Sequence, residues 1–277
     1  MKSRWTDAMK RAVPRGWRLW LRRRLHGATY SGNYASWAAA RAASVGYDAA
    51  LIFERTLAAA RAVRSGAAEW DRDTVLFNAP AVNQPVLAAL RHAAAANGGR
   101  LHLMDFGGAL GSTWWQHRAC LGDLVDVRWS VVEQPQVVAA GQREFTAGAL
   151  RFYETVEACC AIEHPTVALF SSVLLYVENP HQVLQDIADR PFRQVIIDRT
   201  GFTRDGTDRL TVQQVPRSIY PASYPCWFFD RARLLRPFAR DWRVAAEWQT
   251  MDAVDIAADH GGLMLERIAF DRGHSPP

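Results

Sequence analysis

An acidic residue and a cluster of glycines stand together in residues 101–112, which read LHLMDFGGALGS. A short apolar run ends at Asp105, and a turn rich in small residues then leads into a segment of helical character through Gly107, Gly108, Gly111 and Ser112. A strand, a glycine turn and a helix start in this order form the nucleotide-binding corner of an open α/β sheet. Glycines allow close backbone approach to a ligand, and a helix N-terminus offers free N–H groups.

Two nucleotide fingerprints can be compared with this stretch. A dinucleotide site requires G-x-G-x-x-G, but counting from Gly107 the second and third glycine positions hold Ala109 and Ser112. The pattern acidic-x-Gly-x-small-x-Gly is filled instead, from Asp105 to Gly111. A carboxylate at this point suits a ligand that carries a cation better than it suits a pyrophosphate. The stretch therefore disfavours NAD(P) and an NAD(P)-dependent reductase.

The filled pattern resembles motif I of class I S-adenosylmethionine (SAM)-dependent methyltransferases. The resemblance implies that Asp105 and the glycine backbone, with Ser112 beside them, hold the amino-acid end of SAM, which carries an ammonium group. A buried glycine turn in another α/β fold is the alternative.

A second acidic residue closes the next apolar run. The segment DVRWSVVEQP ends in Glu133 and Gln134 and is stopped by Pro135. An acidic residue at the end of the second strand of such a unit suits a pair of ribose hydroxyls. Glu133 comes 28 residues after Asp105, which is compatible with one strand–helix–strand unit. We therefore expect Glu133, with Gln134 next to it, to bind the cofactor.

Short apolar runs alternate with helical segments from residue 101 onward, which predicts a parallel sheet with right-handed crossovers. The runs after the first two lie at residues 150–153, 166–170, 194–197, 243–248 and 263–270, with Gly261 and Gly262 expected as a turn. The last two runs resemble the terminal hairpin of class I methyltransferases, in which one strand is antiparallel. We predict an α/β Rossmann-like class I methyltransferase fold with a mostly parallel seven-stranded sheet.

Polar residues at the ends of later strands are candidates for the reacting centre. Methyl transfer requires alignment of the acceptor, exclusion of water and, for a hydroxyl, removal of a proton. Ser171 and Ser172 follow the fourth strand, and we expect them near the sulfonium. Asp198 follows the fifth strand and His117 follows the glycine turn. Asp198 and His117 are the predicted catalytic bases, and His181 and Tyr176 are further candidates.

The chain divides into three parts by composition. Residues 1–27 hold nine Lys or Arg and one acid, so this basic tail has a net charge of +8. Because the whole chain has a net charge of +5, the remaining residues have a net charge of −3. Residues 28–98 contain helical patterns and we expect an all-helical extension that caps the cofactor domain. Residues 99–277 form the SAM-binding domain, with a substrate insertion at about residues 201–240.

The insertion is rich in aromatic and polar residues and is broken by Pro216, Pro221 and Pro225. We expect it to lie outside the core, because prolines restrict the backbone and remove hydrogen-bond donors. Ligands of open α/β sheets bind beyond the carboxyl ends of the strands, where this insertion begins. We therefore assign it to the acceptor site, with the predicted contacts Arg199, Gln213, Tyr220 and Tyr224.

Composition excludes several classes of protein. Four cysteines lack metal-ligand spacing, so we expect reduced thiols in a cytoplasmic protein and no metal site. No stretch approaches 18 consecutive apolar residues. The tail combines arginines with Trp17 and Trp20, which favours either peripheral contact with an anionic membrane or a loosely docked tail. The mildly acidic body argues against an extended nucleic-acid footprint.

Several longer runs resemble one group of methyltransferases, the TIGR04325 family. They include GNYASW, LMDFGGALGS, RWSVVEQP, FSSVLLYVENP, LTVQQVP and SYPCWF, and with shorter runs they extend over about residues 30–250. The resemblance implies SAM dependence and an association with surface-polysaccharide assembly. We expect O-methylation of a small or lipid-linked polar acceptor, a sugar-type hydroxyl. A non-catalytic module that binds SAM or another nucleotide is the alternative from a different class.

Overall fold

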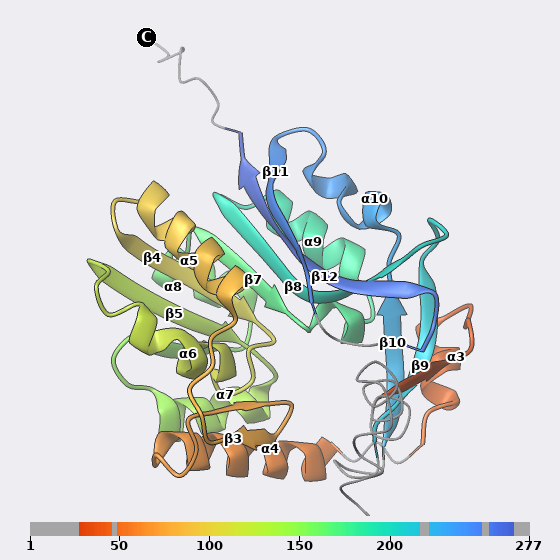
Figure 1. The fold of residues 1–277 in the computed structure, drawn as a ribbon, viewed down its shortest axis with the longest axis horizontal. Helices are drawn as coiled ribbons and strands as arrows, with labels where there is room; N and C mark the ends of the chain where they lie inside the picture. Colours follow the sequence, from red (N-terminus) through yellow and green to blue (C-terminus); the bar gives the residue numbers. More distant parts are fainter. Residues whose placement is uncertain (1–27, 46–48, 217–221, 251–254, 269–277) are drawn as a thin grey trace, which may run out of the picture.

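The computed structural model describes residues 28–45, 49–216, 222–250 and 255–268 (Figure 1). Within these residues, seven strands form the central sheet. In spatial order they are β11 (Trp242–Gln249), β12 (Ala258–Arg267), β8 (Gln194–Thr203), β7 (Val167–Ser171), β4 (Arg100–Phe106), β5 (Asp126–Val132) and β6 (Leu150–Tyr153). Strands β6, β5, β4, β7 and β8 are parallel, and β12 is antiparallel to both of its neighbours. The predicted fold class, with its terminal hairpin, is confirmed.

Helices cover both faces of this sheet, as expected for parallel strands that are apolar on both sides. One core joins the sheet to the helices α4 (Ala49–Arg64), α5 (Gln84–Ala96) and α7 (Pro135–Ala140). The other core lies under α8 (Val156–Glu163), α9 (Pro180–Ala188) and α10 (Arg231–Leu234). Alternate residues of the strands supply the two cores, so that Leu103 faces the first and Met104 the second. Figure 1 shows α5 in front of the sheet and α8 and α9 behind it.

The insertion is a second sheet rather than a loop outside the core, which corrects the prediction. β8 continues past Asp198 to Thr203, and β9 (Arg209–Gln214) and β10 (Ser223–Phe228) then pair antiparallel. Strand β1 (Thr29–Ser31) adds to the other edge of β9. Leu210, Cys226 and Phe228 are fully buried, so these strands build core despite their polar composition.

The extension before the sheet contains helix α3 (Trp37–Ala42), α4 and α5, as its helical patterns predicted. Ser36, the N-cap of α3, accepts a hydrogen bond from the Ala39 N–H at 3.2 Å. The extension is nevertheless not all-helical, because residues 28–45 and 49–98 also hold β1 and the hairpin of β2 (Trp70–Arg72) and β3 (Val75–Phe77). Asp73 and Thr74 form its turn, both with positive φ.

Gly261 and Gly262 lie within β12 and do not form the predicted turn. Their strand has a register shift against β8 between Gly261 and Leu263. A Cβ on Gly262 would stand 2.3 Å from the indole of Trp248, so the glycine leaves room for a ring that crosses the strand. The pair marks a close approach between neighbouring strands, which is the other common use of glycine in a sheet.

Candidate cofactor and acceptor site

The glycine turn links β4 to helix α6 (Ser112–His117) and folds back over Asp105. Gly107 has φ 68°, and a Cβ there would lie 2.2 Å from Cγ2 of Val173. A Cβ on Gly108 would lie 2.5 Å from the carboxyl carbon of Asp105. Both positions therefore require glycine. Gly111, with φ 87°, is the N-cap of α6 and completes the turn.

Asp105 is fully buried at the end of β4. Its Oδ2 accepts a hydrogen bond from Trp129 Nε1 at 2.9 Å, while its Oδ1 has no partner. Burial raises the pKa of Asp105 to about 7, the hydrogen bond from Trp129 opposes this rise, and the charge of Glu133 adds to it. A buried carboxylate oxygen without a partner is costly, so this group is suited to meet a cationic ligand.

Glu133 follows β5, beside the glycine turn. Its Oε1 accepts from the Ala109 N–H at 3.3 Å and its Oε2 from the Gln134 N–H at 2.7 Å. Burial raises the pKa of Glu133, and these two backbone bonds limit the rise. The predicted cofactor residues of β4, the turn and β5 thus lie together. Gln134 is exposed as the N-cap of α7.

Ser112 contacts the carboxylate of Asp71, which was not among the predicted site residues. Its Oγ donates to Oδ2 of Asp71 at 3.3 Å, from the first residue of α6 to strand β2. Asp71 is 5% exposed, and its Oδ1 has no partner. Burial raises the pKa of Asp71 to about 6, although the bond from Ser112 lowers it.

Asp198 is fully buried at the carboxyl edge of the sheet, where several side chains donate hydrogen bonds to it. Its Oδ2 accepts from Asn83 Nδ2 at 3.0 Å and Ser171 Oγ at 3.2 Å, and its Oδ1 accepts from Trp248 Nε1 at 2.8 Å. The Ser172 N–H donates to the Asp198 carbonyl at 2.9 Å. Ser171 and Ser172 therefore lie at this edge, and their position near the sulfonium stays a prediction. A carboxylate that accepts three protein donors and is closed to solvent positions other groups, and a role of Asp198 as a base stays a prediction.

His117 is also fully buried. Its Nδ1 lies 2.8 Å from the Thr113 carbonyl and its Nε2 lies 3.4 Å from the Asn83 carbonyl. Burial lowers the pKa of His117, and the hydrogen bonds to these two carbonyls oppose the fall. Both ring nitrogens face backbone oxygens of the protein. In this geometry His117 holds α6 against the start of α5, and its role as a base stays a prediction.

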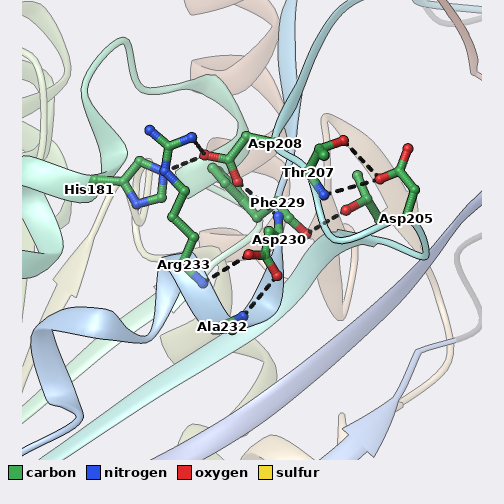
Figure 2. A network of polar contacts seen from close by, with 9 residues as sticks. His181, Asp205, Thr207, Asp208, Phe229, Asp230, Ala232 and Arg233 are labelled. Atoms are coloured by element: carbon green, nitrogen blue, oxygen red, sulfur yellow. Dashed lines mark hydrogen bonds and ion pairs between the residues drawn. The ribbon is translucent and has the colours of Figure 1, made fainter.

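The two further base candidates are also engaged. His181 on α9 pairs with Asp208 at 2.8 Å, and Arg233 of α10 approaches the same carboxylate at 3.3 Å. Asp208 also accepts from the Asp230 N–H at 2.8 Å, so this network ties the second sheet to α9 and α10 (Figure 2). Tyr176 donates to Oε1 of Gln213 at 2.9 Å.

The predicted acceptor contacts lie on the second sheet and its neighbours. Gln213 and Tyr224 are cross-strand partners on β9 and β10, and the ring of Tyr224 meets that of Tyr176 edge-on, with centroids 5.3 Å apart. Arg199, with φ 51°, pairs with Asp73 of the β2–β3 turn at 2.9 Å. Tyr220 lies outside the described residues, as does the basic tail at residues 1–27.

The residues at the glycine turn fit SAM. The unpaired Oδ1 of Asp105 suits the ammonium group, the glycine backbone permits close approach, and Glu133 stands where ribose hydroxyls would bind. Within the described residues there is no group of three or more His, Cys, Asp or Glu that could hold a metal ion. In the same part of the chain, no helix has the length and apolar character needed to cross a bilayer.

Comparisons with known proteins give structural likenesses only. No protein-family model and no curated protein sequence matches the chain, so the narrower family resemblance stays a prediction. The N-terminal domain of EvdMO1 with SAH bound is 14% identical over 80% of this chain and 98% of that chain, with a TM-score of 0.45. Glycopeptide N-methyltransferase MtfA complexed with sinefungin is 10% identical over 65% and 93%, with a TM-score of 0.45.

A third similar structure is the 1,6-didemethyltoxoflavin-N1-methyltransferase of Burkholderia thailandensis with 1,6-didemethyltoxoflavin and S-adenosylhomocysteine bound. It is 17% identical over 80% of this chain and 89% of that chain, with a TM-score of 0.42. None of these likenesses assigns an activity to this chain.

Residues missed by sequence reasoning come from distant segments. Asp71, Asn83, Trp129 and Trp248 each contact a predicted site residue. The run WDRDTVLF contains the one usable signal, because an acidic turn between two apolar patches favours a hairpin. Asn83 and Trp248 gave no local signal for the site, because their role depends on the packing of helix and strand around Asp198.

Proposed function

We propose that this protein is a SAM-dependent methyltransferase that acts on a small or lipid-linked polar acceptor, a sugar-type hydroxyl. The observation that carries the proposal is the buried carboxylate of Asp105, whose Oδ1 lacks a partner beneath the glycine turn. A phosphate-binding corner would place backbone N–H groups there and keep an anion away. The acid at this position instead favours a ligand with a positive charge.

The proposed cofactor residues have distinct tasks. Asp105, with Gly107, Gly108, Gly111 and Ser112, holds the methionine end, and Glu133 with Gln134 holds the ribose. Ser171 and Ser172, at the end of β7, flank the reactive end. When bound, SAM supplies a methyl group on a sulfonium. The protein aligns the acceptor and excludes water, and Asp198 contributes by fixing Ser171 and the start of α5.

The proposed acceptor surface combines the second sheet with the end of β8. Gln213 and Tyr224 stand side by side there, and Arg199 is held by Asp73. An aromatic ring next to an amide and a guanidinium suits a sugar ring with its hydroxyls. Residues 1–27 are proposed to bring the protein to the cytoplasmic face of an anionic membrane, where a lipid-linked precursor of a surface polysaccharide would lie.

Two alternatives differ from this proposal in measurable ways. A non-catalytic SAM-binding module would keep the Asp105 corner and show no turnover. An NAD(P)-dependent reductase would need a pyrophosphate next to Asp105, where the like charge disfavours it.

The experiment is methyl transfer from SAM labelled in the methyl group to an extract of the source cells, separated into aqueous and lipid fractions. We expect label that survives alkaline hydrolysis, because methyl ethers survive it and methyl esters do not. Label in the lipid fraction that falls when residues 1–27 are deleted supports a lipid-linked acceptor, and label in the aqueous fraction supports a small one. Tyr224→Ala is expected to lower transfer with SAM affinity unchanged. Absence of label from both fractions contradicts the proposal.

A further inference from the structure

The β2–β3 hairpin brings a fixed carboxylate to the glycine turn. Trp70 stacks on Phe77 across the hairpin with ring centroids 4.0 Å apart and planes 5° apart. The indole N–H of Trp70 donates to the Ala79 carbonyl at 3.1 Å. These contacts hold β2 in place, and Asp71 follows Trp70 directly. The position of Asp71 is therefore set by packing on both sides of the hairpin.

Asp71 is a buried carboxylate with an incomplete set of partners. It is 5% exposed, Ser112 Oγ approaches Oδ2 at the long distance of 3.3 Å, and Oδ1 has no partner. A single weak neutral donor does not offset the cost of burying a carboxylate. The pKa of about 6 leaves this group mostly ionised at neutral pH. Such a group needs a cation.

Asp71 and Asp105 border the same turn. Asp105 lies against Gly108 and Asp71 bonds to Ser112, four residues further along. The Gly111 N–H donates to the Gly108 carbonyl at 2.9 Å and closes the turn between them. Each carboxylate has one oxygen without a partner.

We propose that Asp71 is a cofactor-binding residue, whose carboxylate attracts the ammonium group at the amino-acid end of SAM from the Ser112 side of the turn. The N-terminal extension then completes the cofactor site rather than only covering it. This inference rests on the proposed function, because the ammonium group belongs to that cofactor. No sequence pattern assigns this role to Asp71.

Asp73 provides a matched control on the same hairpin. Its side chain is 63% exposed and pairs with Arg199 at 2.9 Å. Asp73→Asn removes the same charge two residues away while leaving Asp71 and Ser112 in place. A general effect of hairpin charge would therefore appear in both variants, and a direct contact only in Asp71→Asn.

The test is calorimetric titration of the full chain with S-adenosylhomocysteine (SAH) and with 5′-deoxy-5′-methylthioadenosine, which lacks the amino-acid end. We expect Asp71→Asn to weaken SAH about tenfold or more and to leave methylthioadenosine unchanged, because a buried charge pair is lost. Asp73→Asn removes a charge that raises the pKa of Asp71, so it is expected not to weaken SAH and to leave methylthioadenosine unchanged. An equal loss for both ligands, or no loss for SAH, overturns the inference.

A second measurement uses the unaltered chain. Protonation of Asp71 and Asp105 would remove their attraction for the ammonium group, so SAH affinity is expected to fall between pH 8 and pH 5.5 while methylthioadenosine affinity stays level. This measurement can be made even if Asp71→Asn fails to fold. The same dependence of affinity on pH for both ligands would contradict the inference. If the unaltered chain binds neither ligand, the proposed function itself fails, which the variant outcomes alone would not show.

Discussion

Three carboxylates whose pKa values are raised by burial surround a single glycine turn. They belong to Asp71, Asp105 and Glu133, and they come from β2, β4 and the end of β5. Residues with strongly shifted pKa values are common at functional sites. A site that binds a charged ligand holds its own charged groups away from water before the ligand binds. In the protein without ligand, burial of these carboxylates costs desolvation free energy, and a bound cation would offset that cost.

At the scale of residues, this cost predicts a pH dependence of stability. The pKa of Asp105 in the folded protein, about 7, lies above its value in the unfolded chain, about 3.8. The folded state therefore binds the proton more tightly, and the group favours folding as the pH falls from about 7 toward 4, by about 1.4 kcal/mol per pH unit. Relative to Asp105→Asn, the unaltered chain should gain stability from pH 8 to pH 5 in denaturant melts.

Asp126 provides the control for this experiment. Its hydrogen bond from His102 lowers the pKa of Asp126, so the carboxylate stays ionised over the same pH range. The stability difference between the unaltered chain and Asp126→Asn should therefore stay level between pH 8 and pH 5. A difference for Asp105→Asn that also stays level would contradict the burial argument.

At the scale of elements, Asp198 joins four segments of the chain. It lies on β8 and accepts hydrogen bonds from β7, β11 and the N-cap of α5. Asn83 also accepts a hydrogen bond from the Val86 N–H at 3.5 Å. Its side chain therefore both caps α5 and donates to Asp198. The edge of the sheet where the ligand is proposed to bind is thereby held in a fixed arrangement.

The double role of Asn83 predicts a large loss of stability on substitution. Asn83→Ala should lower the free energy of unfolding by about 2–4 kcal/mol, the sum of a lost cap and a lost hydrogen bond to a buried carboxylate. Ser36→Ala removes only a cap, on the exposed start of α3, and should cost about 1 kcal/mol. Denaturant melts of both variants measure the difference. Equal losses would show that the bond to Asp198 contributes nothing.

Local patterns predicted the elements well where periodicity was strong. The runs that became β4 to β8 are local signals. The second sheet was missed because its pairing joins β1 to β9, which are about 180 residues apart in the chain, and no local pattern encodes such a partner. The polar residues of β9 and β10 were interpreted as loop, although most residues of both strands are buried.

At the scale of the whole molecule, some residues of the proposed site could be predicted from the sequence and others could not. Asp105, the glycines and Glu133 lie within one strand–helix–strand unit, so sequence spacing was sufficient to find them. Asp71, Asn83 and Trp248 reach the same edge of the sheet from the extension and from β11. Chain segments from both ends therefore build the proposed site around the cofactor corner.

The central claim is that the glycine turn binds SAM through Asp105, and a calorimetric titration of the full chain with SAH and, separately, with NADH tests it most directly. We expect saturable binding of SAH, no binding of NADH, and a loss of roughly 2–4 kcal/mol of SAH binding free energy in Asp105→Ala, because the buried ammonium group loses its partner. Saturable binding of NADH, or an SAH affinity unchanged by Asp105→Ala, would contradict the claim.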